Sequence, residues 1–248
     1  MFNRSFFSNI PPVTLNLLII NTIVWLFALI APESTTMRLL DFGALHYYTS
    51  QGFGIWQLIT YMFIHVEFFH LFFNMWALVM FGVTIERTLG SRRFLLYYFV
   101  CGIGAALVQL GVYAWSIHEY ASAIPNYAYN EVLTNGWNAL QQGLNYSNLD
   151  LAVLNELING ATIGASGAVF GILLAFGMLY PKAKMYIFFI PYPVNAVWVV
   201  LGYGLLELGL GFAGPDDGIA HFAHLGGMLF GFVLLYYWIR RYKRHGSF

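Results

Sequence analysis

The chain has 248 residues, of which 59% are hydrophobic and 9% are charged, with 11 basic and 11 acidic side chains and a formal net charge of zero. A soluble domain carries about one quarter charged residues, so this composition excludes a soluble enzyme, a disordered chain and a nucleic-acid binder with a basic face. The single cysteine, Cys101, excludes an intramolecular disulfide and any multi-cysteine metal site.

Six segments are apolar and long enough to cross a bilayer, which takes about 20 residues. They cover residues 13–31, 66–85, 94–115, 163–180, 186–212 and 221–239. The fifth contains Pro191 and Pro193, so its helix is expected over 195–212. The sequence therefore predicts an all-α membrane protein, with one membrane domain over residues 1–248 that is a six-transmembrane-helix bundle.

The charges divide between the two sides of this arrangement. One side has only the basic residue Arg38, and eight acids gather there: Glu33, Asp41, Glu119, Glu131, Asp150, Glu156, Asp216 and Asp217. The other side, which holds both termini, collects the remaining basic residues: Arg4, Arg87, Arg92, Arg93, Lys182, Lys184, Arg240, Arg241, Lys243 and Arg244. The positive-inside rule then predicts that both termini are cytoplasmic.

Residues 116–162 form the longest connection and lie on the outer side. This stretch has four acids, no Lys or Arg, and many Asn residues. We expect either a solvated outer loop without chemistry or short interfacial helices, with 129–144 as a candidate. The histidines outside the spans, His46, His118 and His245, are expected to be solvated.

Strongly polar residues inside the spans cluster at one depth. His65, His70 and Asn74 lie at the outer end of the second span, Ser166 begins the fourth, and His221 and His224 begin the sixth. Polar groups in a bilayer cost a few kcal/mol each and are functional candidates by default. Three helices therefore deliver a hydroxyl, imidazoles and an amide to one outer layer of the membrane.

Helical spacing indicates which of these side chains meet. His70 and Asn74 are four residues apart and share a face. The pairs Gly167/Gly171 and Gly227/Gly231 allow close approach of two membrane helices. Because one helix carries Ser166 and the other His224, this approach would bring the hydroxyl to the imidazole, as an activated nucleophile requires.

The remaining polar groups suggest how charge on a reacting carbonyl would be stabilised. His70, Asn74 and the backbone N–H of Ser166 are available as donors to an oxyanion. Two acids, Glu207 in the fifth span and Glu67 at the entrance of the second, are not obviously placed to complete a triad. We therefore predict a Ser166/His224 dyad. Glu86 is expected to make hydrogen bonds at a helix end.

The blocks His65-x4-His70-x3-Asn74, Gly164-Ala165-Ser166-Gly167 and Ala223-His224-x-x-Gly227-x-x-x-Gly231 resemble the rhomboid family of intramembrane serine proteases. Each motif alone is weak, but the three occur in order on suitably oriented spans. The resemblance extends over about residues 11–239.

The resemblance implies a protease that cleaves transmembrane segments of other membrane proteins near the outer membrane face. In this family Ser166 would be the nucleophile and His224 the general base, His70 and Asn74 would bind the oxyanion, and His65 would lie near the active-site mouth. The family's gate and cap for substrate entry would map to about residues 195–220.

The family also implies how the site is supported and what it needs. Gly164, Gly167, Gly171, Gly227 and Gly231 would support helix packing. No metal or cofactor is expected. The partners would be single-span or multi-span membrane protein substrates in a lipid bilayer, with no nucleic acid, and the oligomeric state is not predicted. The six-helix layout suggests the inner (plasma) membrane of a prokaryote.

Two departures from the family pattern and two rival functions accompany this interpretation. Phe170 stands where an aromatic, often Tyr, packs on the catalytic imidazole, and residues 32–57 lack a clear Trp-Arg pair. His221 competes with His224 as the base, although only His224 has Gly at +3 and +7.

The two rival functions are a non-catalytic binding protein and a metal or haem transporter using His221, His224, His65 and His70.

Overall fold

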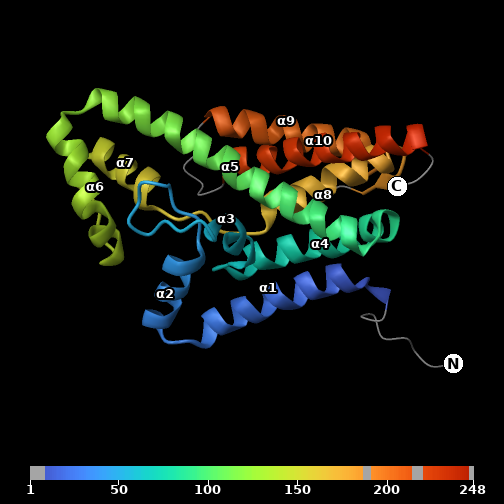
Figure 1. Ribbon diagram of the computed structural model, residues 1–248, viewed down its shortest axis with the longest axis horizontal. Coiled ribbons are helices and arrows are strands. Elements are labelled where there is room, and N and C mark those ends of the chain that lie inside the picture. Colours follow the sequence, from blue (N-terminus) through green and yellow to red (C-terminus); the bar gives the residue numbers. More distant parts are fainter. Residues whose placement is uncertain (1–8, 187–190, 214–219, 246–248) are drawn as a thin grey trace.

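The computed structural model describes residues 9–186, 191–213 and 220–245. Figure 1 shows the long helices as a bundle with their axes roughly aligned, whereas the helices over Glu33–Gly43 and Asn126–Gln141 lie at a steep angle to them. Their bounds are α1 Pro12–Ile30, α2 Glu33–Gly43, α3 Gln57–Thr60, the 3₁₀ turn η2 Tyr61–Phe63, α4 Phe68–Leu89, α5 Ser91–Ala123, α6 Asn126–Gln141, α7 Leu149–Asn159, α8 Ser166–Leu179, α9 Ala196–Ala213 and α10 His221–His245. Strands β1 (Lys184–Met185) and β2 (Val194–Asn195) form a small antiparallel pair before α9.

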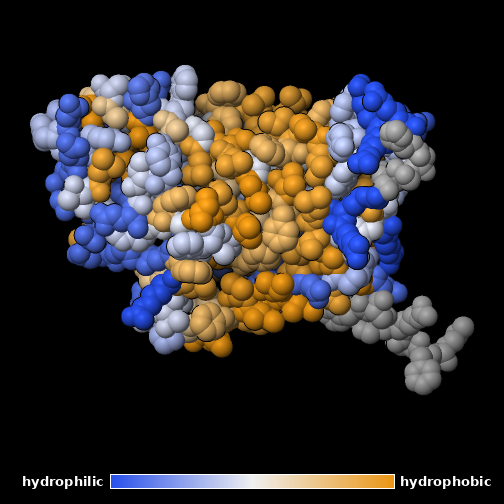
Figure 2. Space-filling view, in the orientation of Figure 1, coloured by the Kyte–Doolittle hydropathy of each residue, from blue (hydrophilic) through white to orange (hydrophobic). Residues whose placement is uncertain are grey.

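Five described helices, α1, α4, α5, α9 and α10, are long and apolar enough to cross a membrane. In Figure 2 an apolar band crosses the middle of the molecule, between two more hydrophilic ends. This is the surface of an all-α integral membrane protein, because lipid replaces water around the band. The start of α1 and the end of α10 lie at the same end of the bundle (Figure 1).

The predicted spans correspond in order to α1, α4, α5, α8, α9 and α10, but several bounds differ. The predicted span 94–115 is part of a 33-residue helix that begins at Ser91 and ends at Ala123. The predicted span 163–180 contains a helix of only 14 residues. Residues 187–190 of the fifth segment, together with Arg4, Asp216 and Asp217, lie outside the described residues.

Of the two alternatives for 116–162, the solvated loop was wrong, because most of this stretch is helical, and the candidate helix over 129–144 corresponds to α6. The first residues extend α5, and α6 and α7 follow. The three helices enclose a small apolar core of their own, formed by Tyr47, Ile117, Val132, Leu154 and Ile158. The apolar residues are spread among Asn and acidic residues, so that no single run signals burial, although together they form one packed cluster.

Helix α8 lies at the centre of the bundle, where it packs against α4, α5, α9 and α10. At 1.5 Å per residue its 14 residues rise about 21 Å, which is less than the bilayer core of about 30 Å. A helix this short cannot reach both membrane faces. If its last residue, Leu179, reaches one membrane surface, then its first residue, Ser166, lies below the opposite surface.

The start of α1 is fixed by a carboxylate from α4. Buried Glu86 accepts hydrogen bonds from the backbone N–H groups of Val13 and Thr14, at 3.0 and 2.7 Å, and from the Ser91 hydroxyl at 2.7 Å. A negative charge at a helix N-terminus satisfies its unpaired N–H groups and its dipole. The predicted role of Glu86 in hydrogen bonding at a helix end is thereby confirmed.

The segment between α2 and α3 is anchored without a Trp-Arg pair. The buried Gln57 side chain donates to the carbonyls of Asp41 and Gly52 and accepts from the His46 N–H. The His46 ring lies against the carbonyls of Asn159 and Gly160 and is only 3% exposed. The expectation that His46 is solvated was therefore wrong: the ring joins this segment to the end of α7.

Candidate active site

Ser166 is the first residue of α8 and follows a constrained backbone turn. Gly164 has φ +115°, a conformation that L side chains rarely adopt, and its N–H donates to the carbonyl of Tyr61 at 2.9 Å. A Cβ at this position would also lie 2.6 Å from Nε2 of His70. Glycine is thus required twice, by the turn and by the closeness of the imidazole, and the turn places Ser166 beside the start of α4.

The predicted close approach of α8 and α10 is present. A Cβ on Gly227 would overlap the carbonyl oxygen of Gly167, and a Cβ on Gly171 would collide with Cys101 of α5. Gly231 is equally confined, by the Tyr97 hydroxyl. The glycines remove the side chains that would separate the helices, so that backbones touch.

This contact brings the predicted hydroxyl and imidazole together. Ser166 Oγ lies 2.8 Å from Nε2 of His224. The ring of Phe170 stacks on the His224 imidazole, with centroids 4.3 Å apart and an interplanar angle of 8°. Phenylalanine therefore supplies the stacking face that the family's usual aromatic would provide, and it restricts the imidazole to a plane that meets Ser166.

The prediction that no acid is obviously placed to complete a triad was wrong, because an acid contacts the other ring nitrogen of His224. Nδ1 of His224 lies 2.9 Å from Oε2 of Glu207, which α9 brings to the side of α10. With the proton on Nδ1 donated to the carboxylate, Nε2 keeps a lone pair that accepts the Ser166 O–H. The geometry is that of a Ser–His–Glu triad.

His221 also faces this carboxylate. Its Nδ1 lies 2.7 Å from the same Oε2 of Glu207, and its side chain is 5% exposed. The expectation that His221 is only a polar residue at a helix end is therefore incomplete. His221 does not contact Ser166 through any described interaction; it holds the acid against which His224 is oriented.

His70 and Asn74 lie in the first two turns of α4, and His65 lies just before this helix. The Asn74 amide donates to the His70 carbonyl at 2.9 Å, which leaves its second N–H. His65 is 1% exposed, its ring lies 4.8 Å from that of His70, and its Nε2 is 3.4 Å from the N–H of Ala165. His65 is thus buried beside His70 and the residue before α8, and its place near the active-site mouth stays a prediction.

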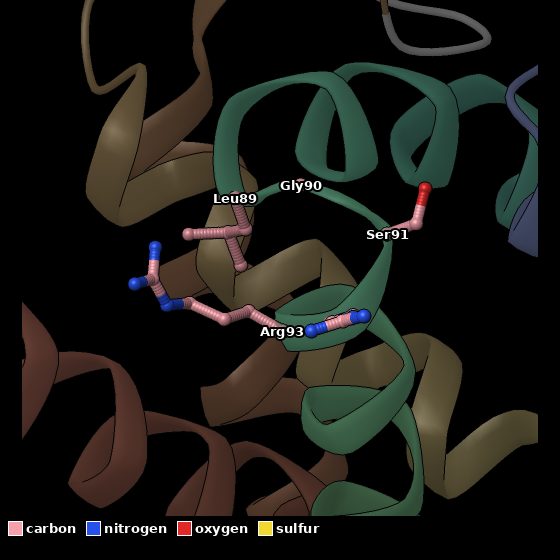
Figure 3. A pocket seen from close by; sticks show the side chains of 5 residues that line it. Leu89, Gly90, Ser91 and Arg93 are labelled. Atoms are coloured by element: carbon pink, nitrogen blue, oxygen red, sulfur yellow. The ribbon is translucent and has the colours of Figure 1, made fainter.

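Figure 3 shows a pocket of about 400 Å³ that is distinct from this cluster. Leu89, Gly90, Ser91, Arg92 and Arg93 line it, at the turn between α4 and α5. The turn follows the last residue of α4, whereas His70 is near the first, and the intervening 19 residues rise about 28 Å. The pocket is therefore at the opposite end of the bundle from Ser166.

Sequence reasoning missed Glu207, although a signal was present. An acid within an apolar span is expensive and needs a partner. Tyr203 and Glu207 are four residues apart, and both face the site: Tyr203 contacts Phe170, and Glu207 contacts His224. The spacing was visible, but the sequence alone did not say which face of α9 meets α10.

Residues 52–241 match the family model described as Rhomboid domain. Curated relatives extend the match. The chain is 27% identical over 230 residues to Rhomboid protease AarA of Providencia stuartii, covering 90% of this chain and 70% of the relative. It is 24% identical over 232 residues to Rhomboid protease GlpG of Haemophilus influenzae, covering 93% of this chain and 92% of the relative.

A third relative is longer than this chain. Rhomboid protein 1, mitochondrial, of Saccharomyces cerevisiae is 31% identical over 182 residues, which are 73% of this chain and 41% of the relative. The chain thus spans less than half the length of that relative. Relatives of mitochondrial and bacterial origin share the matched region.

Proposed function

The chain belongs to the rhomboid family, and on this premise we propose that it is an intramembrane serine endopeptidase that cleaves transmembrane segments of other membrane proteins. One observation carries the proposal: Ser166 Oγ lies 2.8 Å from Nε2 of His224, whose Nδ1 lies 2.9 Å from Glu207. An apolar or purely structural helix contact needs no such chain of hydroxyl, imidazole and carboxylate.

The first half of the reaction forms an acyl-enzyme. Ser166 Oγ attacks the scissile carbonyl carbon while its proton moves to Nε2 of His224, and Glu207 stabilises the resulting imidazolium through Nδ1–H. When the tetrahedral intermediate collapses, Nε2–H gives the proton to the departing amide nitrogen. The C–N bond breaks, the amine product leaves, and the acyl group remains as an ester on Ser166.

The second half releases the acid product. A water molecule attacks the ester carbonyl and gives one proton to Nε2 of His224, which returns it to Ser166 Oγ as the ester bond breaks. Water must therefore reach Ser166, although α8 begins below the surface of the bundle. The polar residues around it, His70, Asn74 and His224, provide a hydrated environment for that water.

The negative oxygen of each tetrahedral intermediate needs donors. The N–H groups at the start of α8 have no partner within the helix, and the helix dipole favours negative charge there. His70 and the second N–H of Asn74 approach from α4. Each such donor contributes about 3–4 kcal/mol to the transition state, so we assign His70 and Asn74 to oxyanion binding together with the Ser166 N–H.

The position of Ser166 in the membrane also limits which substrates can be cleaved. A peptide bond in a helix is shielded by its own hydrogen bonds, so the substrate helix must unwind near the level of Ser166. We propose that substrates have helix-destabilising residues and a small residue at the cleavage point, near the outer membrane face. Placing helix-favouring Leu residues there should slow cleavage of a reporter; undiminished cleavage would contradict this preference.

The charge distribution supports an orientation in which both termini are cytoplasmic, with α1, α4, α5, α9 and α10 crossing the membrane and the shorter α8 as the sixth membrane helix, entering from the outer side. We propose the inner membrane of a prokaryote as its location. Protease protection of tags on either terminus in inverted vesicles tests the orientation: both tags should be digested from the cytoplasmic side.

A serine-reactive fluorophosphonate tests the chemistry without requiring the natural substrate. The purified protein in nanodiscs should become labelled at Ser166, as located by peptide mass spectrometry. Labelling should be lost in Ser166→Ala and fall at least about 10²-fold in His224→Ala, since the imidazole activates the hydroxyl. The exposed Ser147→Ala variant is the matched control and should label normally. Labelling independent of Ser166 would contradict the proposal.

A further inference from the structure

Three potential metal ligands meet beside the proposed nucleophile. One ligand atom each from Glu207, His221 and His224 lies within 4.8 Å of the other two, and Oε2 of Glu207 is 2.7 and 2.9 Å from Nδ1 of His221 and of His224. The three residues are buried, and they come from only two helices, α9 and α10. Because His221 and His224 are one helical turn apart, their rings approach the same carboxylate oxygen from neighbouring positions.

The donor set matches that of zinc. Zn²⁺ is bound by neutral imidazole nitrogen and carboxylate oxygen at about 2.0–2.2 Å, and two histidines with one glutamate leave a fourth position open. In a tetrahedral site with these bond lengths the ligand atoms are about 3.3 Å apart. Oε2 is now 2.7 and 2.9 Å from the two nitrogens. The ligand atoms of the cluster are at most 4.8 Å apart, so the two histidine nitrogens would approach each other by at most about 1.5 Å while the carboxylate oxygen moves back by about half an ångström, movements within the reach of side-chain rotation.

Metal binding and catalysis place opposite demands on His224. As the general base, His224 carries a proton on Nδ1 and a lone pair on Nε2, which faces Ser166 at 2.8 Å. As a zinc ligand through Nδ1 it must carry its proton on Nε2. The N–H then points at the Ser166 oxygen, and the imidazole has no lone pair with which to remove the hydroxyl proton.

We propose that Glu207, His221 and His224 form a zinc-binding site that reversibly switches the protease off. The inference rests on the proposed function, since it assigns regulation to the same His224. His221 has a specific part in it: its Nδ1 lies 2.7 Å from Oε2 of Glu207, so it would be the second imidazole ligand, whereas Ser166 meets Nε2 of His224. Zinc would remove the carboxylate and the base from the triad in one step.

Direct binding is measured first, on a protein that cannot cleave. Zn²⁺ is titrated calorimetrically into Ser166→Ala in nanodiscs. We expect one saturable site per chain and, at the zinc absorption edge, a shell of nitrogen and oxygen ligands near 2.0–2.1 Å. In the same background His221→Asn and Glu207→Gln should each weaken binding at least about 10-fold. His118→Asn, an exposed histidine on α5, is the matched control and should bind as the parent does.

Activity is measured second. Cleavage of a reporter by the wild type should fall as free Zn²⁺ rises and recover when a chelator is added. His221→Asn, compared with its own zinc-free rate, should require at least about 10-fold more zinc for the same inhibition.

The outcomes separate the two proposals. Absence of saturable zinc binding to Ser166→Ala, or binding unaffected by both ligand substitutions, would overturn the zinc site and leave the protease proposal standing. Zinc binding at this site without loss of wild-type activity would overturn the inhibitory role. A wild type that binds zinc here and yet does not react with the fluorophosphonate after the zinc has been removed by a chelator would instead contradict the proposed function.

Discussion

Glu207 reaches His224 from a neighbouring helix: its Oε2 lies 2.9 Å from Nδ1 of the imidazole whose Nε2 faces Ser166. The same oxygen lies 2.7 Å from Nδ1 of His221. The contact makes the position of α9 part of the proposed catalytic apparatus. Any movement that separates α9 from α10 removes the acid from the base.

Glu207→Gln should lower kcat by about 10²–10⁴-fold with little change in KM, because the amide cannot hold the imidazole in the productive tautomer or stabilise its charged form. The measurement is steady-state cleavage of a reporter helix in liposomes. Glu156→Gln, in α7, is the control and should retain wild-type kcat. A Glu207→Gln enzyme within twofold of wild type would show that the site works as a Ser–His dyad.

Gly227→Ala should destabilise the protein by about 1–3 kcal/mol and reduce activity at least 10²-fold. The new Cβ would overlap the Gly167 carbonyl, and displacing α10 by about 1 Å moves His224 away from Ser166. Unfolding in mixed micelles and reporter cleavage measure the two effects. Gly111→Ala, on α5 where a Cβ meets no atom within 4 Å, should leave both unchanged. Normal activity in Gly227→Ala would refute the close-packing requirement.

Glu86→Gln should lower the stability of the protein without affecting catalysis. The two carboxylate oxygens of Glu86 accept hydrogen bonds from Val13, Thr14 and Ser91, and the amide of Gln would present N–H groups to some of these donors. We expect the free energy of unfolding to fall by about 1–3 kcal/mol, with kcat unchanged, because Glu86 lies about 24 Å of helix rise from His70. Glu33→Gln, an exposed acid on α2, is the stability control. A lower kcat at full occupancy of the folded state would contradict the separation.

His46 should make stability depend on pH. Burial lowers the pKa of His46, although hydrogen bonds to the carbonyls of Gly160 and Asn159 oppose the shift. A folded pKa below the unfolded value of about 6.5 means that the unfolded chain binds the proton more readily. Stability is therefore fully present above about pH 6.5 and is lost as the pH falls through that value toward the folded pKa.

The measurement is the free energy of unfolding at pH 7.5 and at pH 5.5. The decrease between them should be smaller in His46→Gln than in the wild type. His118→Gln, an exposed histidine, should keep the wild-type decrease. An unchanged decrease in His46→Gln would mean that this ring is not the responsible group.

The sequence predicted well those features that depend on spacing along one helix. Gly227 and Gly231 after His224, and Gly167 after Ser166, placed the two helices in contact, because small residues at i and i+4 define a close-packing face. His70 and Asn74 were placed on one face in the same way. The apolar length of each segment indicated the order of the main helices.

Features that depend on how two helices are rotated against each other could not be predicted. Glu207 was dismissed because its span gave no reason to prefer the face toward α10, and His221 was then left without its partner. His46 was expected in solvent because a histidine in a polar segment carries no sign of burial; only the fold of α7 against that segment encloses it. The candidate helix over 129–144 corresponds to α6, Asn126–Gln141, whereas α7 was not predicted, because its polar residues gave no sign of packing.

Cleavage of a single-span reporter by purified protein in liposomes tests the central claim most directly. Wild type would be compared with Ser166→Ala, His224→Ala and the exposed control Ser147→Ala. We predict cleavage by the wild type and the control, and no product from the other two, because the hydroxyl and the imidazole act as one unit. Cleavage by Ser166→Ala at the wild-type rate would show that the 2.8 Å contact between Ser166 and His224 is not the catalytic centre.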